Sequence, residues 1–322
     1  MLLREKSFMD DDAGYRHCLY AESLGEFGTP RRMSGSGGFI LTRPIEGFAC
    51  RDAMGCYPLF SCRNRQKLGS DLDALQDSLV SIALVTDPFD EYDEQSLRRW
   101  FPDVMLAFKK HYIVELNRHP EEYVCPHHKR NAAKALKRVH IERCTDPQRY
   151  TAEWYTLYRT LTSRHGITGI AAFSKHAFEM QLRVPGIVAF RAIHEGTTVG
   201  MVLWYLQGDN GYYHLGAYSD DGYAFSASFA LFWSSLICFT EKGVRSLTLG
   251  AGAGLRPDTS DGLTRFKRGW ATGRRQVYFC GRIFNRELYD CITAAKQCST
   301  TDYFPAYRFG QLQEKNRIRS GV

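Results

Sequence analysis

Three consecutive strands followed by one long apolar helix constrain the fold of this 322-residue chain more than any other feature. The strands are expected at 187–194, 198–206 and 212–218. Glu195-Gly196 lies in the first gap and the Gly-rich segment 208–211 in the second, which predicts two antiparallel hairpins. Residues 225–242 are strongly apolar and end at Gly243, a residue typical of a helix C-terminus. This order predicts an α+β fold in which a helix covers a mostly antiparallel sheet.

Further elements flank this segment. Helices are predicted at 147–164 and 173–182 before it, and strands at 245–249 and 275–283 with a helix at 286–296 after it. The first half repeats this order more loosely. Its helices are predicted at 15–24, 71–81, 95–101 and 128–138. Its strands are predicted at 39–41, 58–61, 81–86 and 111–116. A break near Thr145-Asp146-Pro147 predicts domains 1–145 and 146–309, and a basic, poorly packed tail 310–322.

Composition excludes several classes of protein. No run of about 18 apolar residues exists, and the acid-rich start lacks the apolar core of a signal peptide, so we expect a cytoplasmic protein without a membrane span. The ten cysteines form no CxxC pair, which argues against a disulfide framework and against a metal site. Cys125-Pro126-His127-His128 is interpreted as the entry to a helix with solvated histidines, rather than as a set of metal ligands.

A formal net charge of +7 is distributed unevenly. One basic cluster, on the predicted helix after His127, contains Lys129, Arg130, Lys134, Lys137 and Arg138. A second contains Arg265, Lys267, Arg268, Arg274, Arg275, Arg282 and Arg286. Such clusters indicate either a polyanionic partner, such as a nucleotide, CoA or tRNA, or two ordinary solvated faces.

The segment LTLGAGAGLRPDTSDGLTRFKRGW, residues 247–270, carries the most chemistry. Gly250 and Gly252 follow an apolar strand, where glycine lets the backbone approach a ligand. Lys267 follows a polar loop and can stabilise negative charge that develops on an oxygen. A dinucleotide site is rejected, because Leu255 to Asp258 predict a loop where that fingerprint needs a helix.

These landmarks, with VGMVLWY, GYYHLGAYSDDGY and SFALFW, resemble the Gcn5-related N-acetyltransferase (GNAT) pattern over most of the chain. In particular, the chain resembles the tandem-GNAT FemABX-like group, and HHKRNAAKAL is similar to the basic helix that ends the first domain of that group. The resemblance implies two tandem GNAT-like domains, each a mixed, mostly antiparallel sheet flanked by helices, with the first one degenerate.

The resemblance also implies acyl transfer to an amine, with acetyl-CoA as donor in classical members and aminoacyl-tRNA in FemABX members. By resemblance, Lys267 stabilises the oxyanion and Phe266 shapes the acceptor pocket. The alternative is that Lys267 is one more exposed basic residue between Arg265 and Arg268.

One departure concerns the loop that binds the CoA pyrophosphate in classical members, which reads R/QxxGxG/A. Here residues 219–228 hold one glycine, two acids and no basic residue. Ser226 and Ser228 either present hydroxyl and amide groups to the donor or cap the helix. The weak loop and the basic helix favour aminoacyl-tRNA, whereas the similarity of the sequence to N-acetyltransferases favours acetyl-CoA.

His214 lies in the middle of a predicted strand and either accepts a proton from the attacking amine or is a packed histidine. Tyr218, Trp270 and Arg164 are predicted to contact the acceptor. Signatures of hydrolases, metalloproteases and NTPases are missing from the sequence. We therefore predict an N-acyltransferase that acts on a small-molecule or peptide amine, without a metal, with acetyl-CoA preferred and aminoacyl-tRNA as the alternative donor. A second alternative is an inactive GNAT-fold binding module.

Overall fold

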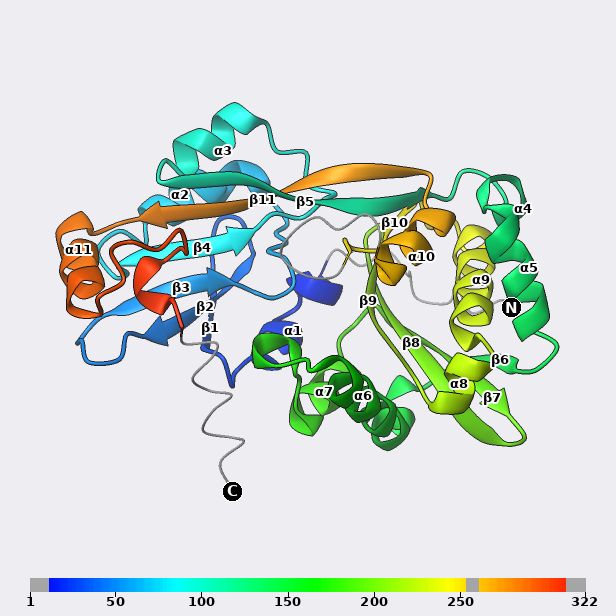
Figure 1. Cartoon of the computed structure of the whole chain (residues 1–322). Helices are drawn as coiled ribbons and strands as arrows, with labels where there is room; N and C mark the ends of the chain where they lie inside the picture. The colour runs from blue at the N-terminus through cyan, green and yellow to red at the C-terminus, as the bar shows by residue number, and fades with distance from the viewer. Residues whose placement is uncertain (1–11, 253–260, 311–322) are drawn as a thin grey trace, which may run out of the picture. The chain divides into compact units, whose positions relative to one another are not determined.

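The computed structural model describes residues 12–252 and 261–310 (Figure 1). Two compact units are present, and neither is one continuous segment of the chain. Within the described part, unit 1 comprises residues 12–17, 109–167, 174–252 and 261–276, and unit 2 comprises 18–108, 168–173 and 277–310. This division cuts across the predicted boundary at residue 145, because strands that pair in space come from distant parts of the sequence.

Unit 1 contains a mixed, mostly antiparallel sheet in the order β5-β10-β9-β8-β7-β6. Its strands are β6 (His140–Cys144), β7 (Ile187–His194), β8 (Thr197–Gln207), β9 (Asn210–Tyr218), β10 (Ser246–Thr248) and the end of β5 (Val104–Glu115). All neighbours are antiparallel except β10 and β9, which run parallel. The first residues of β11 (Gly273–Ile283) also belong to this unit.

Helices cover both faces of strands β7 to β9. They are α4 (Pro120–Tyr123), α5 (Pro126–Ala135), α6 (Thr151–His165), α7 (Lys175–Gln181), α8 (Asp220–Ala224), α9 (Ala227–Glu241) and α10 (Gly262–Trp270), with short turns η1 (Gly14–Arg16) and η3 (Pro147–Tyr150). Helices α6 and α7 lie on one face and α9 on the other (Figure 1). On the α9 face, Trp204 packs against Phe232 and Phe239, which accounts for the apolar character of this helix.

In unit 2 the strands are arranged in the order β1-β2-β3-β4-β11. Its elements are α1 (Cys18–Glu22), β1 (Thr29–Arg32), β2 (Phe39–Pro44), β3 (Arg51–Gly55), η2 (Arg65–Lys67), α2 (Leu68–Asp73), β4 (Ser81–Val85), α3 (Glu94–Trp100), η4 (Gly169–Ala171), α11 (Arg286–Ala295) and η5 (Ala306–Arg308). The β3–β4 pair is parallel and the others are antiparallel. The predicted α+β class, with mostly antiparallel sheets flanked by helices, is confirmed.

Several predicted elements differ in detail. The helix predicted over 71–81 is α2, which ends at Asp73, and the strand predicted over 58–61 is reduced to one bridge between Phe60 and Thr86. The sequence analysis missed α10, β1, β3 and β6. The loop predicted after Gly254 and the tail after Gly310 lie outside the described residues. In the described part of the chain, no helix is long and apolar enough to span a membrane.

Candidate active site

Strands β9 and β10 are neighbours over a short distance only. Residues Ser246 to Thr248 of β10 pair with Asn210 to Tyr212 of β9. From Tyr213 to Tyr218, β9 pairs with β8 on one side and has no strand neighbour on the other among the described residues. The parallel pair therefore ends where the glycine segment 250–252 begins, and we call this place the strand split.

Lys267 projects from α10 toward the strand split. Its Nζ atom donates a 2.6 Å hydrogen bond to the carbonyl oxygen of Ala251, and only 6% of the residue is exposed. The helix is fixed at its start because the Asp261 carboxylate accepts a hydrogen bond from the Thr264 amide at 2.8 Å, as a standard N-cap does. The alternative of an exposed lysine is therefore wrong for this residue.

The two glycines allow this close approach. Gly250 has a φ of +71°, a left-handed conformation that favours glycine, and a Cβ there would lie 3.3 Å from the Lys267 Nζ. A Cβ on Gly252 would lie 2.1 Å from the Thr264 hydroxyl. The backbone of this segment thus contacts the face of α10 that carries Thr264 and Lys267.

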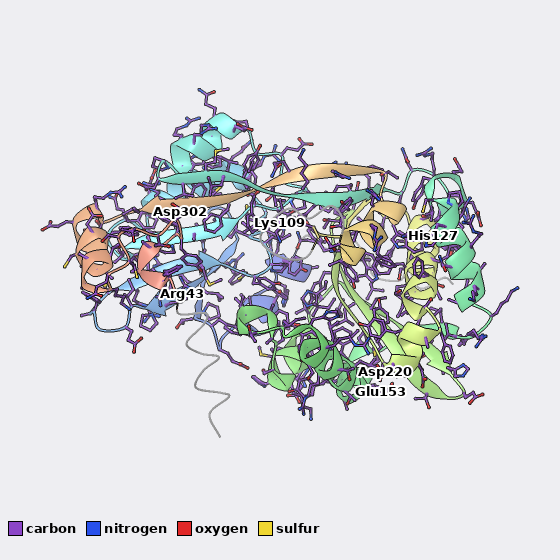
Figure 2. The ribbon with its side chains drawn as sticks, in the orientation of Figure 1. Arg43, Lys109, His127, Glu153, Asp220 and Asp302 are labelled. Carbon is purple, nitrogen blue, oxygen red and sulfur yellow. The ribbon has the colours of Figure 1, made fainter. Side chains whose placement is uncertain are left out.

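Two basic side chains of β5, Lys109 and His111, interact electrostatically with Lys267. Burial and, to a lesser extent, the positive charge of Lys109 lower the pKa of Lys267 to about 7, and the Asp261 carboxylate opposes this shift. Burial, Lys267 and Lys109 together lower the pKa of His111 to about 3. The His111 ring accordingly stays neutral, with Nδ1 3.2 Å from the Thr248 hydroxyl. Figure 2 labels Lys109, which is half-buried on β5.

This arrangement can stabilise an anion. With a pKa near 7, Lys267 is present in both charged and neutral forms at neutral pH. Its ammonium form has three donor protons, of which the bond to Ala251 uses one. A buried cation beside a strand split can donate to an oxygen that becomes negative, where the low dielectric strengthens the interaction.

Phe266 and Trp270 lie on a different face of α10. Both rings pack into an aromatic cluster with Phe229, Phe232 and His128. Trp270 is fully buried there, and Phe266 is half-buried. The structure therefore places the predicted pair Phe266-Lys267 on two sides of one helix rather than in one pocket.

His214 lies on the face of β9 opposite to α9. Its Nδ1 is 3.1 Å from the Tyr15 hydroxyl and its Nε2 is 3.1 Å from the Gln181 Oε1. Burial lowers the pKa of His214 to about 3, so the ring is neutral. By contrast, the ring of the preceding Tyr213 packs on Trp204 and lies 5.8 Å from the Lys267 Nζ. The structure thus places His214 in a packed hydrogen-bond network and does not join it to Lys267.

Tyr218 and Arg164 occupy the far end of β9. Tyr218 is buried and exchanges a hydrogen bond with Tyr213, which lies nearer the strand split. Arg164, near the end of α6, forms an ion pair with Asp220, and its guanidinium lies 4.2 Å from the ring centre of Tyr223. These contacts fasten α6 to α8.

The predicted donor loop contains the short helix α8. Ser219 caps it by accepting a hydrogen bond from the Gly222 amide, and its first turn carries Asp220 and Asp221. Ser226 stands at the N-cap position of α9 with a φ of +57° and no side-chain capping bond, and Ser228 lies in the first turn of that helix. Asp220 pairs with Arg164, whereas Asp221 is exposed at this place and repels an anionic donor group.

The basic helix is α5, which ends at Ala135, so Lys137 and Arg138 lie beyond it. Arg130, Lys134, Lys137 and Arg138 are exposed, whereas Lys129 is half-buried and pairs with Glu121. His127 is exposed on the same helix (Figure 2), but His128 is buried. The prediction of two solvated histidines is therefore wrong for His128. Among the described residues, no group of three or more potential ligands could hold a metal ion.

Comparison with protein families identifies the region that contains these features. Residues 127–268 match the family model described as the acetyltransferase (GNAT) domain. This segment is therefore similar to a GNAT domain. It extends from the basic helix to Arg268 and includes the strand split, α9 and Lys267. No curated protein matches the chain significantly.

Solved structures resemble this fold over most of the chain. FemX matches with a TM-score of 0.65 and 14% identity, over 85% of this chain and 93% of that one. The C-terminal domain of a putative lysylphosphatidylglycerol synthetase from Agrobacterium fabrum matches with a TM-score of 0.57 and 13% identity, over 87% and 93%. The L-PGS protein of Bacillus licheniformis gives 0.53 and 12%, over 91% and 97%. The chain thus shares the fold of FemX, and its residues 127–268 match the GNAT family model, in agreement with the predicted FemABX-like fold.

Lys109 and His111 are members of the Lys267 cluster that the sequence analysis did not select. They alternate along KKHYIVEL, which places both on one face of β5. That alternation indicates that the two side chains share one face of the strand. However, only the antiparallel pairing of β5 with β10 brings this face to Lys267.

Proposed function

We propose that the protein is an N-acyltransferase in which Lys267 stabilises the oxyanion formed when an amine attacks an acyl carbonyl. The observation that carries this proposal is the burial of Lys267 at the strand split, with Nζ on the Ala251 carbonyl oxygen. The proposal also rests on the match of residues 127–268 to the acetyltransferase (GNAT) domain. Because Phe266 and Trp270 pack away from Lys267, they do not fill the strand split.

The reaction we propose is addition and elimination at the acyl carbon. The amine nitrogen forms a bond to the carbonyl carbon, the carbonyl oxygen takes the negative charge, and the bond to the leaving thiol or hydroxyl then breaks. The ammonium of Lys267 donates to that oxygen. Since His214 is neutral and both of its ring nitrogens have partners, we assign the proton of the amine to solvent or to the substrate.

We propose aminoacyl-tRNA as the donor. Asp220 and Asp221 occupy the position where a CoA pyrophosphate would need positive or neutral groups. The exposed residues Arg130, Lys134, Lys137 and Arg138 offer a basic surface to a nucleic acid. The likeness in fold to FemX and to the domain of a putative lysylphosphatidylglycerol synthetase supports an aminoacyl group.

Acetyl-CoA is the second candidate donor, favoured by the description of the matched family as acetyltransferases. In that case the amides and hydroxyls of Ser226 and Ser228, at the start of α9, would hold the donor. For either donor, a primary amine on a small molecule or peptide is the acceptor that we propose.

Binding of each donor distinguishes the candidates. We would titrate the protein with acetyl-CoA and, separately, with bulk aminoacyl-tRNA, at several salt concentrations. If tRNA is the donor, replacing Arg130, Lys134, Lys137 and Arg138 by Gln reduces the salt dependence of its binding, since fewer counterions are released. Saturable binding of acetyl-CoA alone would support the second candidate. Binding of neither donor would overturn both and leave a GNAT-fold binding module.

A further inference from the structure

Cys125 and His128 form a hydrogen-bonded pair at the start of α5, on the side of α10 that carries Phe266. The Cys125 Sγ lies 3.2 Å from the His128 Nδ1. The His128 Nε2 lies 2.8 Å from the carbonyl oxygen of Phe266. A thiol, an imidazole and a group that orients the imidazole are the three parts of an activated nucleophile.

The carbonyl of Phe266 determines which nitrogen of His128 carries the proton. A carbonyl oxygen only accepts, so the Nε2 atom must be the donor in this bond. In the neutral ring, Nδ1 is then unprotonated and accepts from the thiol of Cys125. Burial lowers the pKa of His128, which keeps this base neutral, although the Phe266 carbonyl opposes that shift.

The pair is held rigidly. The Cys125 amide donates a 3.1 Å hydrogen bond to the carbonyl oxygen of Gly269, which fixes the residue to α10. The His128 ring contacts Trp270 and Phe229 edge to face, with centroid distances of 4.8 and 5.0 Å. Such packing positions the imidazole before any ligand arrives, as an efficient proton acceptor requires.

A cavity of about 630 Å³ opens beside the Cys125 thiol. Phe229 and Phe266 provide an aromatic wall, and Arg265 and Arg268 add two exposed cations. Cys125 is half-buried, so its sulfur is accessible from this cavity. The lining suits a ligand with a flat apolar body and a negative charge.

We propose that Cys125 is a reactive nucleophile and a site of modification, activated by His128, that exchanges with anionic disulfides. The proton of Sγ moves to the His128 Nδ1, and Sγ forms a bond to one sulfur of the disulfide. The disulfide bond of the reagent breaks, its other half leaves as a thiolate, and His128 releases the proton to solvent. This reaction is independent of acyl transfer at Lys267.

The test uses 5,5′-dithiobis(2-nitrobenzoate), an aromatic disulfide with two carboxylates, on the full chain. Stopped-flow absorbance measures release of the leaving thiolate, and peptide mass spectrometry locates the mixed disulfide. We expect Cys125 to react at least ten-fold faster than Cys18 and Cys291, which are exposed. The fast phase should disappear in Cys125→Ser. Equal rates at all three cysteines would overturn the proposal.

A double variant tests the class of ligand without disturbing the pair. Arg265→Gln with Arg268→Gln should slow the anionic reagent at least three-fold and leave neutral 4,4′-dithiodipyridine unaffected. Equal slowing of both reagents would contradict the preference for anions. These side chains are exposed, so the variant should keep its fold.

The pH profile tests the role of His128 in the wild-type protein. A thiol without a base loses about ten-fold in rate per pH unit below its own pKa. With His128 accepting its proton, Cys125 should lose less than that between pH 8 and 6 toward the neutral reagent. His127, Arg265 and Arg268 also lie beside Cys125 and His128. The double arginine variant measures how much the two arginines contribute to the pH profile. If the rates of Cys125 and Cys18 fall equally between pH 8 and 6, His128 is not the base of Cys125.

Discussion

The Nζ atom of Lys267 donates a hydrogen bond of 2.6 Å to the carbonyl oxygen of Ala251. This bond joins α10 to the segment that follows β10, and it holds a lysine where a charged side chain is costly to bury. The lowered pKa of Lys267 is the direct result of that burial. Strongly shifted lysines are frequent at functional sites, and the predictions below begin with this one.

Replacing Lys267 by Ala should lower kcat by about 10²–10³-fold, the usual effect of losing one oxyanion donor. Lys110→Ala is the matched control, because Lys110 is an exposed lysine next to Lys109 in the chain. Steady-state kinetics with the donor that binds would measure both variants. A Lys267→Ala enzyme within five-fold of the wild type would show that the oxyanion is held by other groups.

Activity that depends on the charged form of Lys267 should fall as the pH rises through about 7. The ammonium is fully formed below that value and is lost above it. Lys109, His111 and Asp261 also interact electrostatically with Lys267, but His111 stays neutral throughout, since its pKa is about 3. In Lys267→Arg, which keeps its charge, the fall near pH 7 should vanish. Rates measured between pH 6 and 9 with a weakly basic amine acceptor would show it, and an unchanged profile would argue against this role.

Lys267→Met should stabilise the fold at neutral pH. The pKa of Lys267 is about 7 in the folded protein and 10.5 ordinarily, so between these values the unfolded chain binds more protons and stability rises with pH. The methionine variant has no amine at this position, so its unfolded state gains no stabilisation from binding a proton there. Its advantage should be on the order of a few kcal/mol near pH 7 and should shrink toward pH 10. Urea unfolding at pH 7 and 9.5 tests this, and a constant difference would mean that Lys267 is not buried as described.

His214→Leu should destabilise the protein and leave catalysis nearly intact. The substitution removes a hydrogen-bond partner from the Tyr15 hydroxyl and from the Gln181 side chain, at a cost of about 1–3 kcal/mol. We expect kcat to change by less than three-fold once the variant is folded. Unfolding curves and kinetics on the same preparation separate the two effects. A loss of kcat near 10²-fold would restore His214 as the base.

Two glycines of α10 offer a matched pair of alanine variants. A Cβ on Gly269 would lie 2.3 Å from the His128 ring, whereas a Cβ on Gly262 would meet nothing within 4 Å. Gly269→Ala should therefore cost about 1–3 kcal/mol through overpacking, despite the better helix propensity of alanine. Gly262→Ala should be neutral or slightly stabilising. Equal unfolding free energies for the two variants would disprove the close packing of α10 on α5.

The sequence predicted the strands of the GNAT domain well because local chemistry determines them. The strand predicted over 187–194 matches β7 at both ends, and the predicted turn between β8 and β9 uses Gly208 in a left-handed conformation. Strand β1, with the sequence TPRR, has no such pattern, and its pairing with β2 rather than local preference makes it a strand. Helix α10 was missed because it is short and has glycines at its first and next-to-last positions, although Asp261 caps it in the ordinary way.

The site was predictable only in part, because some of its residues meet through tertiary packing and not through proximity in the sequence. Lys267 and Gly250 lie in one segment and could be selected together, and the structure brings them together. Lys109 and His111 come from β5, and Cys125 and His128 meet α10 only through tertiary packing. A single sequence does not encode these distances directly. The strand position of His214 suggested a catalytic histidine, yet Tyr15, from another part of the chain, supplies the partner that explains it.

The interleaved units have a consequence for inheritance and for engineering. Residues 18–108 of unit 2 stand between two stretches of unit 1, and residues 277–310 return to unit 2 at the end. A single crossover in the gene therefore does not transfer one unit whole, and recombination between homologues would mostly produce chimaeras in which a core mixes residues of the two parents. Exchange of function between such proteins should proceed by point substitution and loop replacement rather than by shuffling of domains.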